Sequence, residues 1–435
     1  MKSFIIKGNY HIVKLIIALF LIPLNFLQPQ PKLHLRMPGQ VHPLLFEINT
    51  FPDDSLINFN YSYRISYNHL VFIKDGNDYE ASLKISLELI DSVKNTVTRQ
   101  FEEKQVAVDN FESTNNKNLF VEGLIKLKIS PGDYKILTFF TDNKLNKEFH
   151  LQPIFKRIKK TKKNFIKPLV VDSKSIQCSG NKFYSLTNYR GEIPFSENEY
   201  YLVIPSLDTT INSITLTMIN NSDTVYDKKV TECFIGNGSL GECNGKILLD
   251  NNGSNYFKYF LVKNFSHKLK EGELKIEISR GNNSEKPEQF YKKIVWLDKP
   301  FSLSDPNIAI KALKYVEADS VIDNLLSFKD SELYQKLFDY WKKSDPTPET
   351  MYNPLMNEYY SRVDYAAREF ASIGSKNGAN SDRGRIFIRF GKPQKIERGS
   401  DEDGRIVETW VYEKANKKFI FVDKEGKGEF KLING

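Results

Sequence analysis

Apolar and polar residues alternate along the first third of the chain. Between residues 81 and 89, Ala, Leu, Ile, Leu and Leu alternate with Ser, Lys, Ser and Glu, and Ile125, Leu127 and Ile129 repeat the pattern. A period of two is typical of a strand that buries one face. A lone strand loses about as much in backbone entropy as its buried side chains gain, so it needs a second sheet. We therefore predict a β-sandwich over residues 40–155.

A Pro-Gly turn follows residue 130, and Tyr134 stands where the next strand begins. In Greek-key sandwiches a tyrosine at such a corner bonds back to nearby backbone. We therefore predict that Tyr134 is a structural clamp and that the sandwich is immunoglobulin-like or fibronectin-like. A related stretch, 269–276, carries Leu274 in the place of Tyr134, between segments that also alternate. This similarity predicts a second sandwich over residues 165–300.

The pattern changes after residue 300. Apolar residues at spacings of three and four predict a helix that Asp330 caps, with Leu333, Leu337 and either Tyr340 or Trp341 on one face. Asn353 is a suitable cap for a second helix, in which proline takes the first position. The buried face of that helix is expected at Met356, Tyr360, Val363, Ala367 and Phe370.

A period of two returns near the end of the chain. Residues Arg385 to Phe390 are predicted to form a strand, which ends at Gly391, Lys392 and Pro393. Residues 406–412 are predicted to form the next strand, with Ile406, Glu408, Trp410 and Tyr412 on one face. A terminal hairpin follows over 419–432. Helices followed by an antiparallel meander make an α+β domain, predicted at 305–435. The predicted fold class is therefore multidomain: two all-β sandwiches, then this α+β domain.

Length and composition agree with several β-rich domains. A chain of 435 residues exceeds the size of a single core. Tyr and Phe supply much of its apolar content, which favours strands. The net charge of +8 arises from 62 basic and 54 acidic residues, a mild excess. The densest basic run, 156–163, could touch phosphates or an anionic membrane, or it could be a solvated connector between domains.

The first 30 residues resemble an export signal. Lys2, Lys7 and Lys14 precede the apolar run Leu15 to Leu24, which is too short to span a bilayer and has the size of a signal-peptide core. We therefore predict that residues 1–30 are a signal peptide or N-terminal anchor, and that the protein is exported to the periplasm, the outer surface or the medium. Cleavage stays open, as does membrane association through the N-terminus.

Three cysteines permit one disulfide. Cys233 and Cys243 bracket a glycine-rich stretch that could let a loop close, so this pair is one candidate. Cys178 could equally pair with either of them.

The last 120 residues resemble the GWxTD domain, a bacterial family named for its motif. The matching segments are Asp345 to Pro348, Glu358 to Tyr360 with Arg362, Val363, Tyr365 and Ala366, Asp382 to Ile388, Gly391 to Pro393, Glu408 to Tyr412 and Phe421 to Asp423. In the naming motif, Gly378-Ala379-Asn380-Ser381-Asp382, Ala379 replaces the tryptophan and Ser381 replaces the threonine. The family has no established biochemical role. Its members are commonly exported with β-domains upstream, which the resemblance implies for this chain too.

No catalytic template is present in the sequence. It contains no HExxH, Gly-x-Ser-x-Gly or P-loop motif, no zinc-spaced His and Cys cluster, and no histidine in the last domain. We therefore assign no catalytic residue, metal ligand or cofactor, and no nucleic-acid partner. The candidate residues are charged side chains that could form a structural or interaction network, together with one tryptophan: Glu358, Arg362, Asp382, Arg383, Arg385 and Trp410.

Three functional hypotheses follow. The leading one is a non-enzymatic protein of the cell envelope, in which the sandwiches are spacers or recognition modules and the last domain binds an envelope protein or a glycan. The rival is a hydrolase with Asp382, Glu358 and Arg383 around a pocket. The third is a purely structural subunit that associates with itself.

Overall fold

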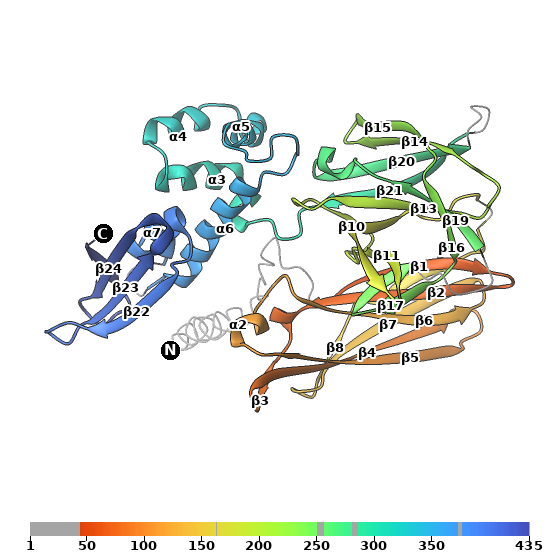
Figure 1. Cartoon of the computed structure of the whole chain (residues 1–435), viewed down its shortest axis with the longest axis horizontal. Helices are drawn as coiled ribbons and strands as arrows, with labels where there is room; N and C mark the ends of the chain where they lie inside the picture. Colours follow the sequence, from red (N-terminus) through yellow and green to blue (C-terminus); the bar gives the residue numbers. More distant parts are fainter. Residues whose placement is uncertain (1–43, 162, 250–255, 281–285, 373–375, 435) are drawn as a thin grey trace, which may run out of the picture. The chain divides into compact units, whose positions relative to one another are not determined.

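The computed structural model describes residues 44–161, 163–249, 256–280, 286–372 and 376–434. Sheets make up the chain as far as Val295, and helices followed by an antiparallel meander make up the rest (Figure 1). This confirms the predicted fold class. The predicted signal segment lies outside the described residues. Within the described part, no helix is both long enough and apolar enough to cross a bilayer.

The first sandwich pairs a three-stranded sheet with a six-stranded one. The first sheet has the order β1 (Leu44–Asp53), β2 (Leu56–Ser66), β6 (Phe120–Ile129). The second has the order β3 (Ile73–Asp75), β4 (Asp78–Asp91), β7 (Gly132–Asp142), β8 (Lys147–His150), with β5 (Val97–Val108) on β4 and β9 (Ile154–Ile158) on β7. A one-turn helix, α2 (Phe111–Thr114), joins β5 to β6.

The core of this sandwich is built as the alternation predicts. Leu83, Ile85 and Leu87 of β4 are buried against Tyr61 and Tyr63 of β2. The Tyr134 hydroxyl donates to the Ser130 carbonyl oxygen at 2.8 Å. The predicted tyrosine clamp is therefore confirmed.

The second sandwich pairs a seven-stranded sheet with a five-stranded one. The first has the order β16 (Cys233–Asn237), β19 (Tyr256–Val262), β13 (Tyr200–Ser206), β10 (Leu169–Cys178), β11 (Asn181–Leu186), β18 (Lys246–Leu249), β17 (Leu240–Cys243). The second has the order β12 (Ile193–Pro194), β21 (Glu288–Val295), β20 (Gly272–Arg280), β14 (Ile214–Asn220), β15 (Asp223–Val230). Leu274, the residue aligned with Tyr134, is fully buried in β20.

The polar face of β2 is buried against the second sandwich. Asn60, Ser62 and Arg64 alternate with the aromatic core residues of β2, yet all three are buried. Arg64 Nη1 donates to the Thr187 carbonyl oxygen at 2.6 Å, and Asn188 Nδ2 donates to the Tyr63 carbonyl oxygen at 2.9 Å. These hydrogen bonds offset part of the desolvation of the groups, although Arg64 Nε and Asn188 Oδ1 are buried without a partner. The two sandwiches thus meet through a polar, buried junction.

The C-terminal part begins with the helices α3 (Pro306–Ala312), α4 (Asp319–Leu326), α5 (Asp330–Lys342), α6 (Pro354–Glu369) and α7 (Asp382–Phe390). It ends with the meander β22 (Lys395–Ser400), β23 (Ile406–Tyr412), β24 (Lys417–Asp423), β25 (Phe430–Asn434). Asn353 caps α6 as predicted, since its Oδ1 accepts from Met356 N at 3.0 Å. Asp330 was predicted to cap α5, but it is the first helical residue and Lys329 precedes the helix.

The prediction of a strand over Arg385 to Phe390 is wrong, because these residues form the end of α7. Ile386, Ile388 and Phe390 fit a period of two, but Ile386, Phe387 and Phe390 fit a helical face equally well. The capping residues decide between a strand and a helix. Ser381 Oγ accepts from Gly384 N at 3.0 Å, and the helix ends at Gly391, whose φ of 77° is a left-handed value that favours glycine.

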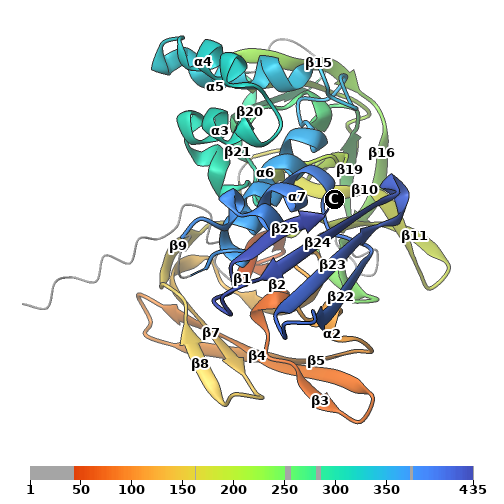
Figure 2. The same ribbon diagram turned by 90° about the vertical axis from the view of Figure 1, so that its left-hand side faces the viewer.

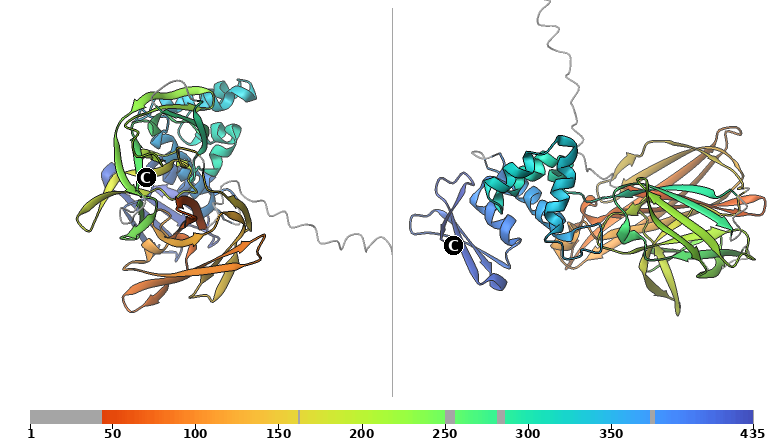
Figure 3. Two further views of the ribbon diagram at one scale, coloured as in Figure 1. Left: turned by 90° about the vertical axis from the view of Figure 1, so that its right-hand side faces the viewer. Right: turned by 90° about the horizontal axis from the view of Figure 1, so that it is seen from above.

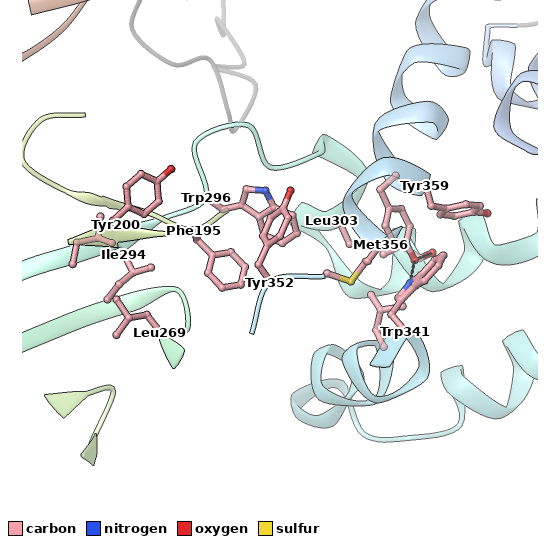
Figure 4. Close-up of a cluster of buried hydrophobic side chains, with 14 of the residues drawn as sticks. Phe195, Tyr200, Leu269, Ile294, Trp296, Leu303, Trp341, Tyr352, Met356 and Tyr359 are labelled. Carbon is pink, nitrogen blue, oxygen red and sulfur yellow. Dashed lines mark hydrogen bonds between the residues drawn. The ribbon is translucent and has the colours of Figure 1, made fainter. Parts of the chain in front are cut away.

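The second sandwich and the C-terminal helices share one hydrophobic core (Figure 4). Phe195 and Trp296 from the sandwich side meet Tyr352, which lies just before α6. The three ring centroids are 5.3 to 5.4 Å apart, in edge-to-face arrangements. Because this core is continuous, the sandwich and the helices stabilise one another.

The disulfide joins Cys178 to Cys243, so the Cys233–Cys243 pair proposed from the sequence is wrong. Cys178 ends β10 at the β10–β11 turn, and Cys243 ends β17 at the β17–β18 turn. Strands β11 and β18 are neighbours, which brings the two turns together with Cα atoms 6.3 Å apart. Cys233 lies on β16, at the opposite end of the sheet order, and is a free, exposed thiol.

We expect Cys178→Ser to lower the free energy of unfolding by about 2–4 kcal/mol, because the disulfide restricts a long loop in the unfolded chain. Cys233→Ser is the matched control and should leave stability unchanged. Thermal unfolding with and without reductant measures both. If Cys178→Ser and Cys233→Ser changed the stability equally, or if reductant left the melting temperature of the parent chain unchanged, the pairing of Cys178 with Cys243 would be contradicted.

Candidate functional site

The segment Gly378 to Asp382 is a tight turn that docks α7 onto α6. Its first residues form a single 3-10 turn, Gly378–Asn380. A side chain at Gly378 would overlap the backbone of Ala366 and Ala371 at the end of α6. A side chain at Gly384 would overlap the Gly378 carbonyl oxygen. Glycine is needed at both positions because backbone meets backbone there.

The other residues of this turn hold it in place. Ser381 Oγ donates to the Gly378 carbonyl oxygen at 2.6 Å and caps α7. Asn380 Oδ1 accepts from the Tyr315 hydroxyl at 2.9 Å. Ala379, which stands in place of the tryptophan, is 1% exposed and packs in the shared core. Each of these residues therefore has a role in folding.

Asp382 ties the start of α7 to the last strand. Its Oδ1 accepts from Arg385 Nη2 at 2.5 Å, and its Oδ2 accepts from the backbone N of Leu432 in β25 at 2.9 Å. Both carboxylate oxygens are thus occupied. A carboxylate held in this way is not free to act on a substrate.

Glu408 is the central charged residue of the domain, and the sequence interpretation missed it. Its side chain is 6% exposed. One oxygen accepts from Arg383 Nη1 at 3.2 Å and from Trp410 Nε1 at 3.3 Å, and the other accepts from Arg398 Nε at 2.9 Å. The Arg383 guanidinium also lies 4.0 Å from the ring centroid of Phe430. The signal was present in the sequence, since Glu408 is the acidic residue on the face of 406–412 that also carries Trp410 and Tyr412.

The structure divides the six candidate residues into three groups. Arg383 and Trp410 meet at Glu408, and Asp382 pairs with Arg385. Arg362 Nε donates to Glu358 at 2.6 Å on the exposed face of α6.

These groups do not form the pocket of the hydrolase hypothesis. Glu358, Asp382 and Arg383 each bond to a different partner, and none of the contacts among the described residues joins one of the three to another. The carboxylates therefore do not converge on one reacting atom, as a general acid and base must.

Tyr412 is buried on the face of the meander that the helices cover. Its hydroxyl donates to the Gly391 carbonyl oxygen at 2.8 Å, and burial raises the pKa of the phenol above its usual range. This bond fixes the turn between α7 and β22 to the end of the inner strand β23.

The other face of the meander is not covered by helices. Figure 2 shows β22 to β25 side by side with α6 and α7 behind them, and Figure 3 shows the helices against one side of the same strands. Residues that alternate with Glu408 and Trp410 point to this uncovered face. Val407, Thr409, Val411 and Ile420 are β-branched and half-buried, and Val422 beside Val407 is 3% exposed. Lys395, Glu397 and Lys418 are their exposed cross-strand neighbours. We call these eight residues the open sheet face.

Comparison with known families matches residues 282–433 to the GWxTD domain. The predicted resemblance is confirmed, and we call this part of the chain the GWxTD domain. The match begins upstream of residue 305, where the sequence patterns place the start of the last domain, and it includes β21 of the second sandwich. The family segment thus contributes a strand to the five-stranded sheet as well as the helices and meander, in agreement with the shared core.

Solved structures give weak similarities over a little more than half of the chain. The C-terminal domain of the Streptococcus pyogenes antigen I/II-family protein AspA is 7% identical, with a TM-score of 0.17, and the match covers 58% of this chain and 100% of that domain. The Streptococcus agalactiae AgI/II polypeptide BspA C-terminal domain is 10% identical, with a TM-score of 0.16, over 58% of this chain and 100% of that one. Purple acid phosphatase PPD1 from yellow lupin (Lupinus luteus) is 10% identical, with a TM-score of 0.16, over 57% of this chain and 40% of that one. No curated protein matches the chain.

Proposed function

We propose that the protein is a non-enzymatic scaffold of the cell envelope, in which the sandwiches hold the GWxTD domain and the open sheet face binds a protein partner. The observation that carries this proposal is that Asp382 and Glu408 of the GWxTD domain are engaged in folding while helices leave one sheet face uncovered. Both oxygens of Asp382 and both of Glu408 are occupied within the domain. What remains available is a surface for recognition.

The shared core supports a scaffold role. The rings of Phe195, Trp296 and Tyr352 join the sandwich to the helices, and the helices pack against the meander. A partner bound to the meander is therefore connected to the sandwiches through packed side chains, which deform little.

The composition of the open sheet face favours a protein over a glycan as the partner. Val407, Val411 and Ile420 offer apolar, rigid side chains, and lysines lie at the margin. No aromatic ring that could stack on a sugar lies among the described residues of this face. An apolar centre with a charged rim is the usual arrangement of protein interfaces.

Two observations support export. The apolar run Leu15 to Leu24 follows three lysines, and Cys178 is bonded to Cys243. Disulfides persist in the periplasm and outside the cell and are rare in the cytosol. We therefore propose a location in the periplasm, on the outer surface or in the medium.

The test is capture of envelope proteins by the purified chain, with cross-linking. We expect Val407→Lys to reduce the yield of captured partner by about tenfold, because Val407 lies between Val422 and Gly399 and a charge in such an apolar contact costs more than about 1 kcal/mol. Val97→Lys makes the same change at an exposed position of β5 and should have no effect. Failure to capture any reproducible protein, or equal capture by both variants, would overturn the proposal.

A further inference from the structure

The hairpin of β17 and β18 extends from the second sandwich onto the first, where it contacts β6 (Figure 1). It lies at the end of the seven-stranded sheet, and the ladder that joins it to β11 is a single pair, Ser185 with Leu248. We call residues 240–249 the strap. Apolar residues of the strap are buried in one cluster with Phe51 of the first sandwich: Leu240, Ile247 and Leu249. The two ends of the strand pair are therefore held by apolar packing.

The turn end of the strap contacts the first sandwich through two ion pairs. Glu242 Oε1 accepts from Lys104 Nζ of β5 at 2.6 Å, and Lys246 Nζ donates to Glu122 Oε1 of β6 at 2.5 Å. The Glu122 side chain is 1% exposed, so its charge depends on nearby cations rather than on water. Lys104 also pairs with Glu102 of its own strand at 2.8 Å, so it keeps a counter-charge if the strap moves.

The disulfide holds this turn end in place. Cys243 is next to Glu242 in the sequence and opposite Lys246 across the hairpin, so it lies between the two charged side chains. Its bond to Cys178 fastens the strap to the β10–β11 turn. A second contact between the two turns, from Asn244 Nδ2 to a backbone carbonyl oxygen, is long at 3.5 Å. The turn residues 179–180 and 244–245 are exposed, so a small thiol can approach the disulfide from solvent.

Other contacts between the sandwiches do not involve the strap. Arg64 Nη1 donates to the Thr187 carbonyl oxygen, and Asn188 Nδ2 donates to the Tyr63 carbonyl oxygen. Arg64 also lies opposite Glu122 in the register of β2 and β6, where cross-strand side chains are about 5 Å apart. A cation thus stays beside Glu122 when the strap is displaced. The junction can therefore loosen at the strap while the sandwiches remain attached.

We propose that the Cys178–Cys243 disulfide is a redox-sensitive latch on the strap. When a dithiol reduces it, Glu242 and Lys246 leave Lys104 and Glu122, and the first sandwich loosens from the second. The second sandwich shares its core with the C-terminal helices, whereas the first has a separate core. The latch thus controls how firmly the first sandwich is held to the rest of the chain. It is separate from the open sheet face, so either proposal can fail without the other.

The reduction is a thiol–disulfide exchange in two steps. A thiolate of the dithiol attacks one sulfur of the Cys178–Cys243 bond, which forms a mixed disulfide and releases the other cysteine as a thiol. The second thiol of the dithiol then displaces the remaining cysteine. Two electrons and two protons pass from the dithiol to the protein, so the dithiol becomes a disulfide and both cysteines become thiols.

Carbodiimide cross-linking of the full chain measures whether Glu242 stays at Lys104, with the joined peptides quantified by mass spectrometry. We expect the yield of the Glu242–Lys104 amide to fall by about fivefold or more in Cys178→Ser/Cys243→Ser, because a freed strap spends less time within reach of β5. Cys233→Ser is the matched control, since Cys233 is a free thiol and its replacement should leave the yield unchanged.

An internal control separates a loosened strap from a damaged fold. Glu271 and Lys299 form an ion pair at 2.8 Å with similar exposure, away from the disulfide, and their cross-link should form equally in all chains. Hydrogen exchange of the parent chain gives the second readout. After dithiothreitol treatment, we expect amides of the strap to exchange about tenfold faster and those of α6 to exchange as before.

Three results would overturn the proposal. The first is an unchanged Glu242–Lys104 yield in the double variant. The second is exchange of the strap that dithiothreitol leaves unchanged. The third is loss of the Glu271–Lys299 cross-link as well, because the disulfide would then support the whole fold rather than the strap.

Discussion

Replacing Glu408 with glutamine is expected to destabilise the GWxTD domain by about 3–5 kcal/mol, because it leaves the charge of Arg383 buried without a counter-charge. The Glu408 side chain is 6% exposed and that of Arg383 is 14% exposed, so water cannot replace the lost partner. Glutamine keeps the shape of the Glu408 side chain and one acceptor oxygen, so the loss of stability measures the contribution of the charge. Thermal and denaturant unfolding of the full chain measure the effect.

Two further variants isolate the cause. Asp382→Asn removes a carboxylate whose arginine partner is 56% exposed, so we expect a smaller loss, of about 1 kcal/mol. Arg383→Met combined with Glu408→Leu replaces the buried pair with apolar side chains and should recover much of the lost stability. If Glu408→Gln and Asp382→Asn had equal, small effects, the buried ion pair would not be what holds α7 on the meander.

Replacing Gly378 with alanine is expected to cost about 3 kcal/mol or more, because the added Cβ would overlap the backbone of α6. Backbone cannot rotate away as a side chain can, so α7 must move off α6 to make room. Melting of the full chain followed by circular dichroism measures the loss.

Gly399→Ala is the matched control for this substitution. Gly399 lies on β22, and an added Cβ there would meet no atom within 4 Å. Alanine in a strand is expected to be neutral or slightly stabilising relative to glycine. A Gly378→Ala chain that melts at the same temperature as Gly399→Ala would show that α7 does not pack closely on α6.

Much of the fold could be predicted from periodicity and caps. The alternation at 81–89, the clamp at Tyr134 and the cap at Asn353 are local signals, and each is present in the structure. The error at 385–390 arose because a short apolar run fits both periods. The cap at Ser381 and the glycine at 391 would have decided it.

The contacts between distant segments could not be predicted. Asn60, Ser62 and Arg64 read as a solvated strand face, but the second sandwich covers them. It supplies hydrogen-bond partners to Asn60 and Arg64, whereas Ser62 Oγ donates to the Glu47 carbonyl oxygen within the first sandwich. Cys178 and Cys243 are brought together by the pairing of β11 with β18, which spacing along the chain does not reveal. The role of Glu408 could not be predicted without the position of α7, because its partner Arg383 lies on that helix.

The most direct test of a structural role for the charged residues is hydrogen exchange of α7 in the full chain, with and without Glu408→Gln. We expect the amides of α7 to be protected in the parent chain, because the helix packs between α6 and the meander, and to lose about 100-fold of that protection in the variant. Peptides from the first sandwich should exchange alike in both. Unchanged protection of α7 in the variant would contradict the assignment of Glu408 to folding.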